Sequence, residues 1–167
     1  MAFPSSEPPQ PLSEAVTVLQ ALYGLPSQTG FGSAVFDELI EPGTDVEAIA
    51  RRYYQHFVGK LWEQYGEAAW MNPWKQVYGR PTGIQPDIVA ELQGISDRAA
   101  AQFVPILLLS ETDDQARAAQ ALATVFNHPQ VTDLRVYAIG DGAAMSGLLL
   151  TGCRTTGETT ILISLLD

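Results

Sequence analysis

The sequence predicts an α+β domain, with N-terminal helices packed on one face of a C-terminal antiparallel sheet of three to four strands. Two capping-box patterns, at residues 44–47 and 112–115, each open an amphipathic segment of helical periodicity. The chain beyond residue 134 instead holds three strand-like runs separated by glycine-containing turns. Helices followed by a meander are typical of the α+β class.

We expect one domain over residues 12–167, preceded by a disordered tail. Residues 1–11 contain four prolines and two serines and have too few apolar side chains to offset the entropy of ordering. The 167 residues suit a single domain, and no shift in composition separates a second one.

The N-terminal part of this domain begins with a helix over residues 12–23. Ser13 is its expected N-cap, and Gly24 ends it. A glycine-rich loop follows over residues 28–33, and we interpret the short apolar stretch 33–40 as a helical turn.

The capping box at Thr44 predicts the longest helix, over residues 45–65. Its apolar residues fill two adjoining rows that together cover roughly 200° of the helix surface, against the ~100° of an ordinary surface helix. This helix should therefore pack on two neighbours, or on one neighbour and a partner protein. The two rows are Val46, Ala50, Tyr53, Phe57 and Leu61, and Tyr54, Val58, Trp62 and Tyr65.

A proline break at Asn72-Pro73 predicts a new short helix over residues 73–78, closed by Gly79. Residues 79–85 read as a loop. Two further helical segments follow, at 86–93 and 96–102.

The apolar run 103–109 (FVPILLL) fits either a buried strand or the end of the preceding helix, because periodicity does not separate the two for so short a run. As a strand it would be the fourth of the sheet. The second capping box predicts a helix up to Phe126. The strand-like runs are residues 134–139, 145–153 and 159–166.

Composition excludes several classes of function. The net charge of −10 and the pI near 4.5 repel phosphate backbones and anionic membranes, so we expect no nucleic-acid or membrane partner. Cys153 is the single cysteine, which fits a reducing cytoplasm. The N-terminal residues lack the basic and apolar regions of a secretory signal, and no apolar run reaches the ~20 residues of a membrane span.

The sequence also lacks the motifs of common catalytic centres. No P-loop, zinc-ligand spacing, HExxH or GxSxG pattern occurs, and neither His56 nor His128 has the neighbours of a nucleophile and base pair. We therefore expect no cofactor and no metal, and favour a protein without catalytic activity.

One segment stands out by composition. Residues 51–80 hold all three tryptophans and five of the nine basic residues, and only Glu63 and Glu67 oppose them, so the segment has a charge of +3 in a chain of −10. Aromatic rings with cations are typical of interface hot spots and of sites for planar or anionic groups. Trp70 and Trp74 flank the Asn72-Pro73 break, where a continuous buried face is least expected. The candidate binding residues are Trp70, Trp74, Lys75, Tyr78, Arg80, Trp62 and His56.

Two functions remain open from the sequence. The first is a non-catalytic protein-interaction module, such as an adaptor, regulatory or assembly factor, that uses this aromatic-basic surface to bind another protein or a second copy of itself. The second is a small-molecule-binding domain or small enzyme with an aromatic pocket between the helices and the sheet.

Overall fold

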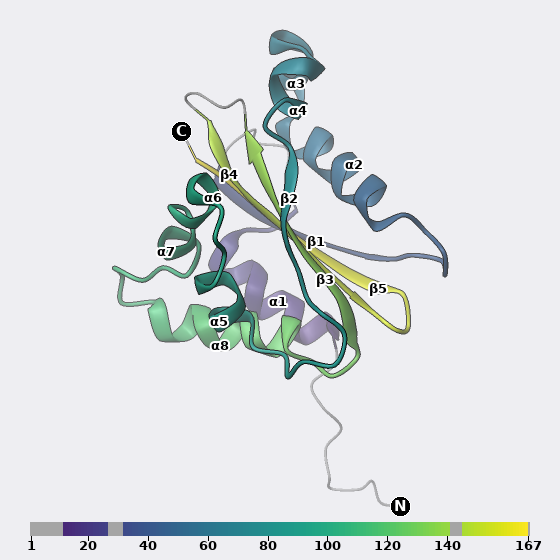
Figure 1. Ribbon diagram of the computed structural model, residues 1–167, viewed down its shortest axis with the longest axis vertical. Coiled ribbons are helices and arrows are strands. Elements are labelled where there is room, and N and C mark those ends of the chain that lie inside the picture. The colour runs from purple at the N-terminus through teal and green to yellow at the C-terminus, as the bar shows by residue number, and fades with distance from the viewer. Residues whose placement is uncertain (1–11, 27–31, 141–144, 167) are drawn as a thin grey trace, which may run out of the picture.

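The computed structural model describes residues 12–26, 32–140 and 145–166 (Figure 1). The expected disordered tail, most of the glycine-rich loop and the predicted turn after Gly140 lie outside these ranges. The elements, in chain order, are α1 (Leu12–Tyr23), β1 (Gly32–Leu39), α2 (Val46–Val58), α3 (Lys60–Tyr65), α4 (Glu67–Met71), β2 (Lys75–Gly79), α5 (Ile88–Gln93), α6 (Arg98–Ala101), α7 (Val104–Leu107), α8 (Gln115–Phe126), β3 (Val131–Gly140), β4 (Ser146–Arg154) and β5 (Glu158–Leu166).

The sheet confirms the predicted α+β class and the C-terminal meander. Strands β3, β4 and β5 form its centre, and the order across the sheet is β1-β5-β4-β3-β2, with every neighbouring pair antiparallel. The described sheet has five strands rather than the expected three to four, because β1 joins the outer side of β5 and β2 joins the outer side of β3.

Helices cover both faces of this sheet, which corrects the expectation of one covered face (Figure 1). One face packs against α1, α5 and α8 through residues such as Val136 and Leu150. The other packs against α2, α3 and α4 through residues such as Tyr137 and Leu149. Successive residues of a strand point to opposite faces of the sheet. Because helices cover both faces, the residues that point to either face are buried, and the central strands are nearly continuous apolar runs.

The prediction of a helical turn over residues 33–40 is wrong, and this double burial is the reason. They form the edge strand β1, in which Ala34, Val35 and Phe36 are all buried. Val35 faces the α1 side, while Ala34 and Phe36 face the α2 side. A strand with two apolar faces lacks the period-2 alternation of apolar and polar residues, so the sequence pattern carries no strand signal.

The predicted helix over 73–78 is also wrong, because residues 75–79 form β2. Lys75 pairs with Ala138 and Gly79 pairs with Arg135, with a register shift between Gln76 and Tyr78. Pairing with β3 outweighs the weak helical preference of so short a segment. A short edge strand with a bulge and a lysine is also protected against pairing with other chains.

The long predicted helix 45–65 is divided in two. Gly59 has φ 65° and ψ −130°, a conformation outside the helical region that glycine adopts readily, and it separates α2 from α3. α2 packs on the sheet through residues of both apolar rows, including Tyr54 and Phe57, while α3 and α4 bring Trp62 and Trp70 over the end of the same core. The residues of the wide apolar face are therefore buried or half-buried, except Tyr65, which is 57% exposed.

The N-caps of α2 and α8 lie one or two residues after the predicted ones. Asp45, not Thr44, caps α2, because its carboxylate accepts the Glu47 amide at 3.0 Å. The second capping box does not form as predicted: the Thr112 hydroxyl accepts the Asp114 amide at 3.0 Å, and α8 starts at Gln115. The ambiguous run 103–109 is helical at Val104–Leu107.

Candidate functional site

The aromatic residues of α2, α3 and α4 form a cluster centred on Tyr54. Trp70 is completely buried and Trp62 is 6% exposed, and their rings lie parallel with centroids 6.4 Å apart. The Tyr54 ring meets both edge to face, and the Trp70 indole donates a hydrogen bond of 3.1 Å to the Leu61 carbonyl. The expectation that Trp70 is exposed at the break is wrong, because α4 folds it back onto the sheet. These two tryptophans are core residues.

Trp74 differs from them because it is only half-buried. Its indole nitrogen donates to Glu47 Oε2 at 2.8 Å. Its ring is stacked on Tyr137, with centroids 4.6 Å apart, and on Tyr54 at 5.7 Å, while the Arg51 guanidinium lies 5.8 Å from its centroid. Because these groups already contact the ring system, Trp74 is held rigidly.

Tyr78 and Arg80 belong to a buried polar clamp. The Arg80 guanidinium contacts both carboxylate oxygens of Glu91, at 2.7 and 2.6 Å, and donates to the carbonyls of Phe126 and Val131. The Tyr78 hydroxyl donates to Glu91 Oε2 at 2.7 Å. The side chains of Arg80 and Glu91 are 3% and 7% exposed. This clamp ties the end of β2 to α5, α8 and β3, so neither Tyr78 nor Arg80 is free to hold a partner.

The clamp shifts the pKa of its acidic members. Burial alone would raise the pKa of Glu91, but hydrogen bonds from Arg80 and Tyr78 outweigh it, and the pKa lies below its ordinary value. Burial and the hydrogen bond to the Glu91 carboxylate raise the pKa of Tyr78 to about 12. The carboxylate is thus held charged and the phenol neutral at physiological pH.

The other cations of the segment are paired with carboxylates from elsewhere in the chain. Arg51 pairs with Glu47, Arg52 with Glu38 and Lys75 with Asp97. Within the described ranges, Lys60 is the basic residue of the segment without a recorded ion pair. The local charge of +3 therefore does not produce an unopposed basic surface.

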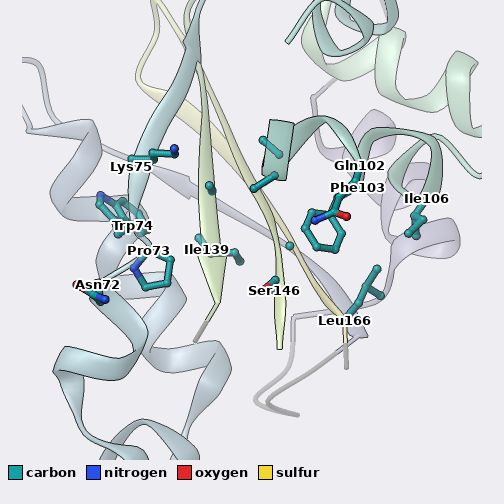
Figure 2. A pocket seen from close by; sticks show the side chains of 14 residues that line it. Asn72, Pro73, Trp74, Lys75, Gln102, Phe103, Ile106, Ile139, Ser146 and Leu166 are labelled. Atoms are coloured by element: carbon teal, nitrogen blue, oxygen red, sulfur yellow. The ribbon is translucent and has the colours of Figure 1, made fainter. Parts of the chain in front are cut away.

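Trp74 and Lys75 line a cavity of about 600 Å³ at one end of the sheet. One wall is the turn from α4 into β2, the other is α6 and α7, and the ends of β3, β4 and β5 lie between them (Figure 2). The lining residues are Asn72, Pro73, Trp74, Lys75, Ala99, Ala100, Gln102, Phe103, Ile106, Ala138, Ile139, Ser146, Gly147 and Leu166.

The sheet itself creates this space. β2 begins at Lys75, which pairs with Ala138, so the last two residues of β3 have no neighbour in β2. The cavity lining there includes the small residues Ala138 and Ser146, and short helices rather than one long helix cover this end of the sheet. The strand residues are small at Ala138, Ser146 and Gly147, which leaves space between the two walls.

His56 lies away from this cavity. It is exposed on α2, where its ring meets Phe36 edge to face at 5.9 Å, and it lines a more open hollow at the α2 and α3 junction together with Trp62. The candidate binding residues therefore divide among four places: the core, the clamp, this hollow and the cavity.

The sequence interpretation missed Phe103, Ile106 and Gln102, which form the second wall of the cavity. The sequence did contain a signal for this wall, because the run 103–109 is more apolar than a short exposed helix requires. In the structure, Ile106 of this run is 48% exposed. Large exposed apolar residues beside a hollow mark a binding surface more often than scattered ones do.

Other site types receive no support from the described part of the chain. Within it, no group of three or more histidine, cysteine or acidic side chains could hold a metal ion. Among the same residues, no helix is both long and apolar enough to cross a membrane.

Comparison of the chain with protein families, with curated proteins and with solved structures returned no match.

Proposed function

We propose that the chain is a non-catalytic binding domain that holds a small molecule in the cavity between the α4 to β2 turn and helices α6 and α7. The cavity itself carries this proposal. Its volume of about 600 Å³ lies within the range typical of ligand sites, and apolar and aromatic walls surround a few polar side chains, as such sites require.

The absence of catalysis is inferred from the groups that line the cavity. Lys75 is the one ionisable residue among the fourteen that line it, and its Nζ lies 2.5 Å from the Asp97 carboxylate. Acid–base and nucleophilic catalysis need a reactive group with a second group placed to activate it. A lysine held in an ion pair supplies neither role.

A protein-interaction module is the second candidate, and the exposure of Ile106 favours it. Ile106 separates the cavity from a small apolar cleft that Pro105 and Leu109 line, so two hollows flank one exposed aliphatic side chain. In this case the partner, another protein or a second copy of the chain, would contact Ile106 and Lys75. Trp62 and Trp70 would contribute rigidity beneath the surface instead of direct contacts.

A plugged variant tests the first candidate. Ala99 is exposed on α6 and lines the cavity, so Ala99→Phe places a ring in the space without removing a core side chain. Ala116→Phe adds the same ring to an exposed position of α8 and serves as the matched control. A fragment library is screened by thermal shift on the wild-type chain. Fragments that stabilise the wild type and Ala116→Phe, but not Ala99→Phe, support the proposal.

The two candidates are separated by a second readout. Ile106→Asp changes the rim of the cavity without filling it. Loss of self-association in sedimentation equilibrium, or of partner capture from the native cell, together with unchanged fragment binding, would favour the interaction module. If neither variant alters fragment binding, self-association or capture, both candidates fail.

A cytoplasmic location remains part of this proposal. The single cysteine supports it, because a chain that needs no disulfide is suited to a reducing compartment. The net charge of −10 supports the further proposal that nucleic acid is not the ligand.

A further inference from the structure

We propose that the cavity selects an uncharged ligand that combines an apolar body with an amide group. This inference rests on the proposed function, since it names the chemical class of the ligand for the same cavity. It follows from the charges, hydrogen-bonding groups and ring faces that the lining residues leave available.

The charges of the cavity are already balanced. The Lys75 ammonium is paired with Asp97, and Asp97 also accepts the Ala100 amide at 2.9 Å. The hydrogen bond from Lys75 keeps the pKa of Asp97 below its ordinary value, so the Asp97 carboxylate stays charged next to the Lys75 side chain. Among the described residues that line the cavity, a charged ligand group finds no opposite charge without a salt-bridge partner, so little offsets the hydration that it loses in a partly enclosed site.

The available polar groups are neutral. The side chains of Asn72, Gln102 and Ser146 line the cavity, and none of the three makes a recorded hydrogen bond within the described part of the chain. Asn72 lies on the wall next to β2, Gln102 on the opposite wall and Ser146 between them (Figure 2). Each carboxamide offers both a donor and an acceptor, which is the pattern that an amide group on a ligand complements.

The apolar part of the ligand would lie against Phe103. The ring faces of Trp74 are in contact with Tyr137, Tyr54 and Arg51, so Trp74 does not offer a free face for stacking. Phe103 is half-buried, has no recorded ring contact in the described chain, and lies on the wall facing the turn that carries Trp74 (Figure 2). Ile106 and Leu166 extend the same apolar surface.

Three probes that share the phenylalanine side chain but differ in charge test this selection. At about pH 6, N-acetyl-phenylalaninamide is uncharged, N-acetyl-phenylalanine carries a carboxylate, and phenylalaninamide carries an ammonium group. Each is titrated into the ¹⁵N-labelled full chain, and the side-chain signals of Asn72, Gln102 and the Trp74 indole are followed by NMR. The dissociation constants come from the same titrations.

The uncharged probe should bind about tenfold more tightly than either charged probe, because neither charge finds a partner in the cavity. Asn72→Leu and Gln102→Leu should each weaken its binding by about three- to tenfold, the loss of one hydrogen bond. Gln93→Leu, at an exposed position of α5 outside the cavity, should leave binding unchanged.

Two different failures can be told apart. A charged probe that binds as tightly as the uncharged one, with shifts at the cavity residues, would overturn the inference and leave the proposed function standing. No shift from any probe, together with no effect of Ala99→Phe on fragment binding, would remove the proposed function as well.

The amide could belong to a free small molecule or to a protein segment, and one more probe distinguishes these sources. The blocked pentapeptide Gly-Gly-Phe-Gly-Gly adds backbone amides to the same side chain. Binding about tenfold tighter than the single-residue probe supports the inference with a protein segment as the source. Equal or weaker binding supports it with a small molecule as the source.

Discussion

Replacing Glu91 by glutamine perturbs the buried clamp while keeping its shape nearly unchanged. In the wild type, the Glu91 carboxylate receives two contacts from Arg80, at 2.7 and 2.6 Å, and one from Tyr78 at 2.7 Å. The variant leaves the Arg80 guanidinium, whose side chain is 3% exposed, without an opposing charge. Removing one partner of a buried ion pair lowers stability by about 3–5 kcal/mol, which is a large fraction of the ~5–15 kcal/mol of a typical domain.

Urea denaturation at pH 7, followed by tryptophan fluorescence, measures this loss. With a slope of about 2 kcal/mol per molar urea, the midpoint should fall by roughly 1.5–2.5 M. Glu63→Gln, at an exposed position of α3, is the control and should stay within about 0.5 kcal/mol of the wild type. A loss below about 1 kcal/mol for Glu91→Gln would refute the argument that the clamp is a buried, charged pair.

Two further measurements sharpen the test. The double variant Arg80→Met with Glu91→Leu removes both charges and should recover more than half of the loss, because it leaves no charge unpaired.

The pH dependence of the stability contributed by Glu91 has a definite sign. The pKa of Glu91 is lowered from its ordinary 4.5, so its contribution is present above pH 4.5 and disappears as the pH falls through the folded-state pKa. The wild type and Glu91→Gln should therefore converge in stability in acid.

Three other predictions concern the sheet and its polar neighbours. Gly147→Ala should reduce stability by about 3 kcal/mol or more, because its Cβ would lie 1.8 Å from the Ser164 carbonyl oxygen. The control Gly94→Ala, whose Cβ has its nearest contact at 3.4 Å, should cost less than about 1 kcal/mol. Equal melting temperatures for the two variants would contradict the prediction. The pKa of Tyr78 is raised from 10.0 to about 12, so its contribution to stability is complete below pH 10 and is lost as the pH rises to 12. The stability difference between the wild type and Tyr78→Phe should shrink over that range in urea titrations, and a constant difference would count against it. Arg154 is 7% exposed, and its Nε and Nη2 have no hydrogen-bond partner among the described residues. Arg154→Met should therefore be as stable as the wild type within about 1 kcal/mol, or more stable. A loss above about 3 kcal/mol in the same assay would be inconsistent with an unsatisfied guanidinium.

The elements that were predicted well are those with a strong local signal. The C-terminal strands follow from β-branched and aliphatic runs bounded by glycine turns. α1 and α8 follow from helical periodicity, although the observed N-cap of α8 is Asp114 and not Thr112. The two strands that were missed, β1 and β2, have no such signal. The middle of β1, from Ala34 to Phe36, is buried on both faces, and β2 is short and depends on its pairing with β3.

The candidate site shows the same division between local and distant interactions. The sequence correctly placed Trp74 and Lys75 next to a break in the chain, and both line the cavity. It placed Trp70 at the surface, but the turn at Gly66, with φ 87°, lets α4 return and bury it completely. The opposite wall comes from residues about 30 positions further along the chain, which no local pattern connects to Trp74.

The sequence by itself therefore determined the fold class, the central meander, the acidic charge and the absence of familiar catalytic motifs, because composition and short-range periodicity carry that information. Only the tertiary structure decided where the side chains of the aromatic-basic segment lie and what they contact. Three of its five cations, Arg52, Lys75 and Arg80, are paired with Glu38, Asp97 and Glu91, which come from β1, from the residue preceding α6 and from α5. Ion pairs and cavities depend on which distant segments are brought together, so a local excess of charge or of aromatic rings does not reveal whether a segment forms a surface or a core.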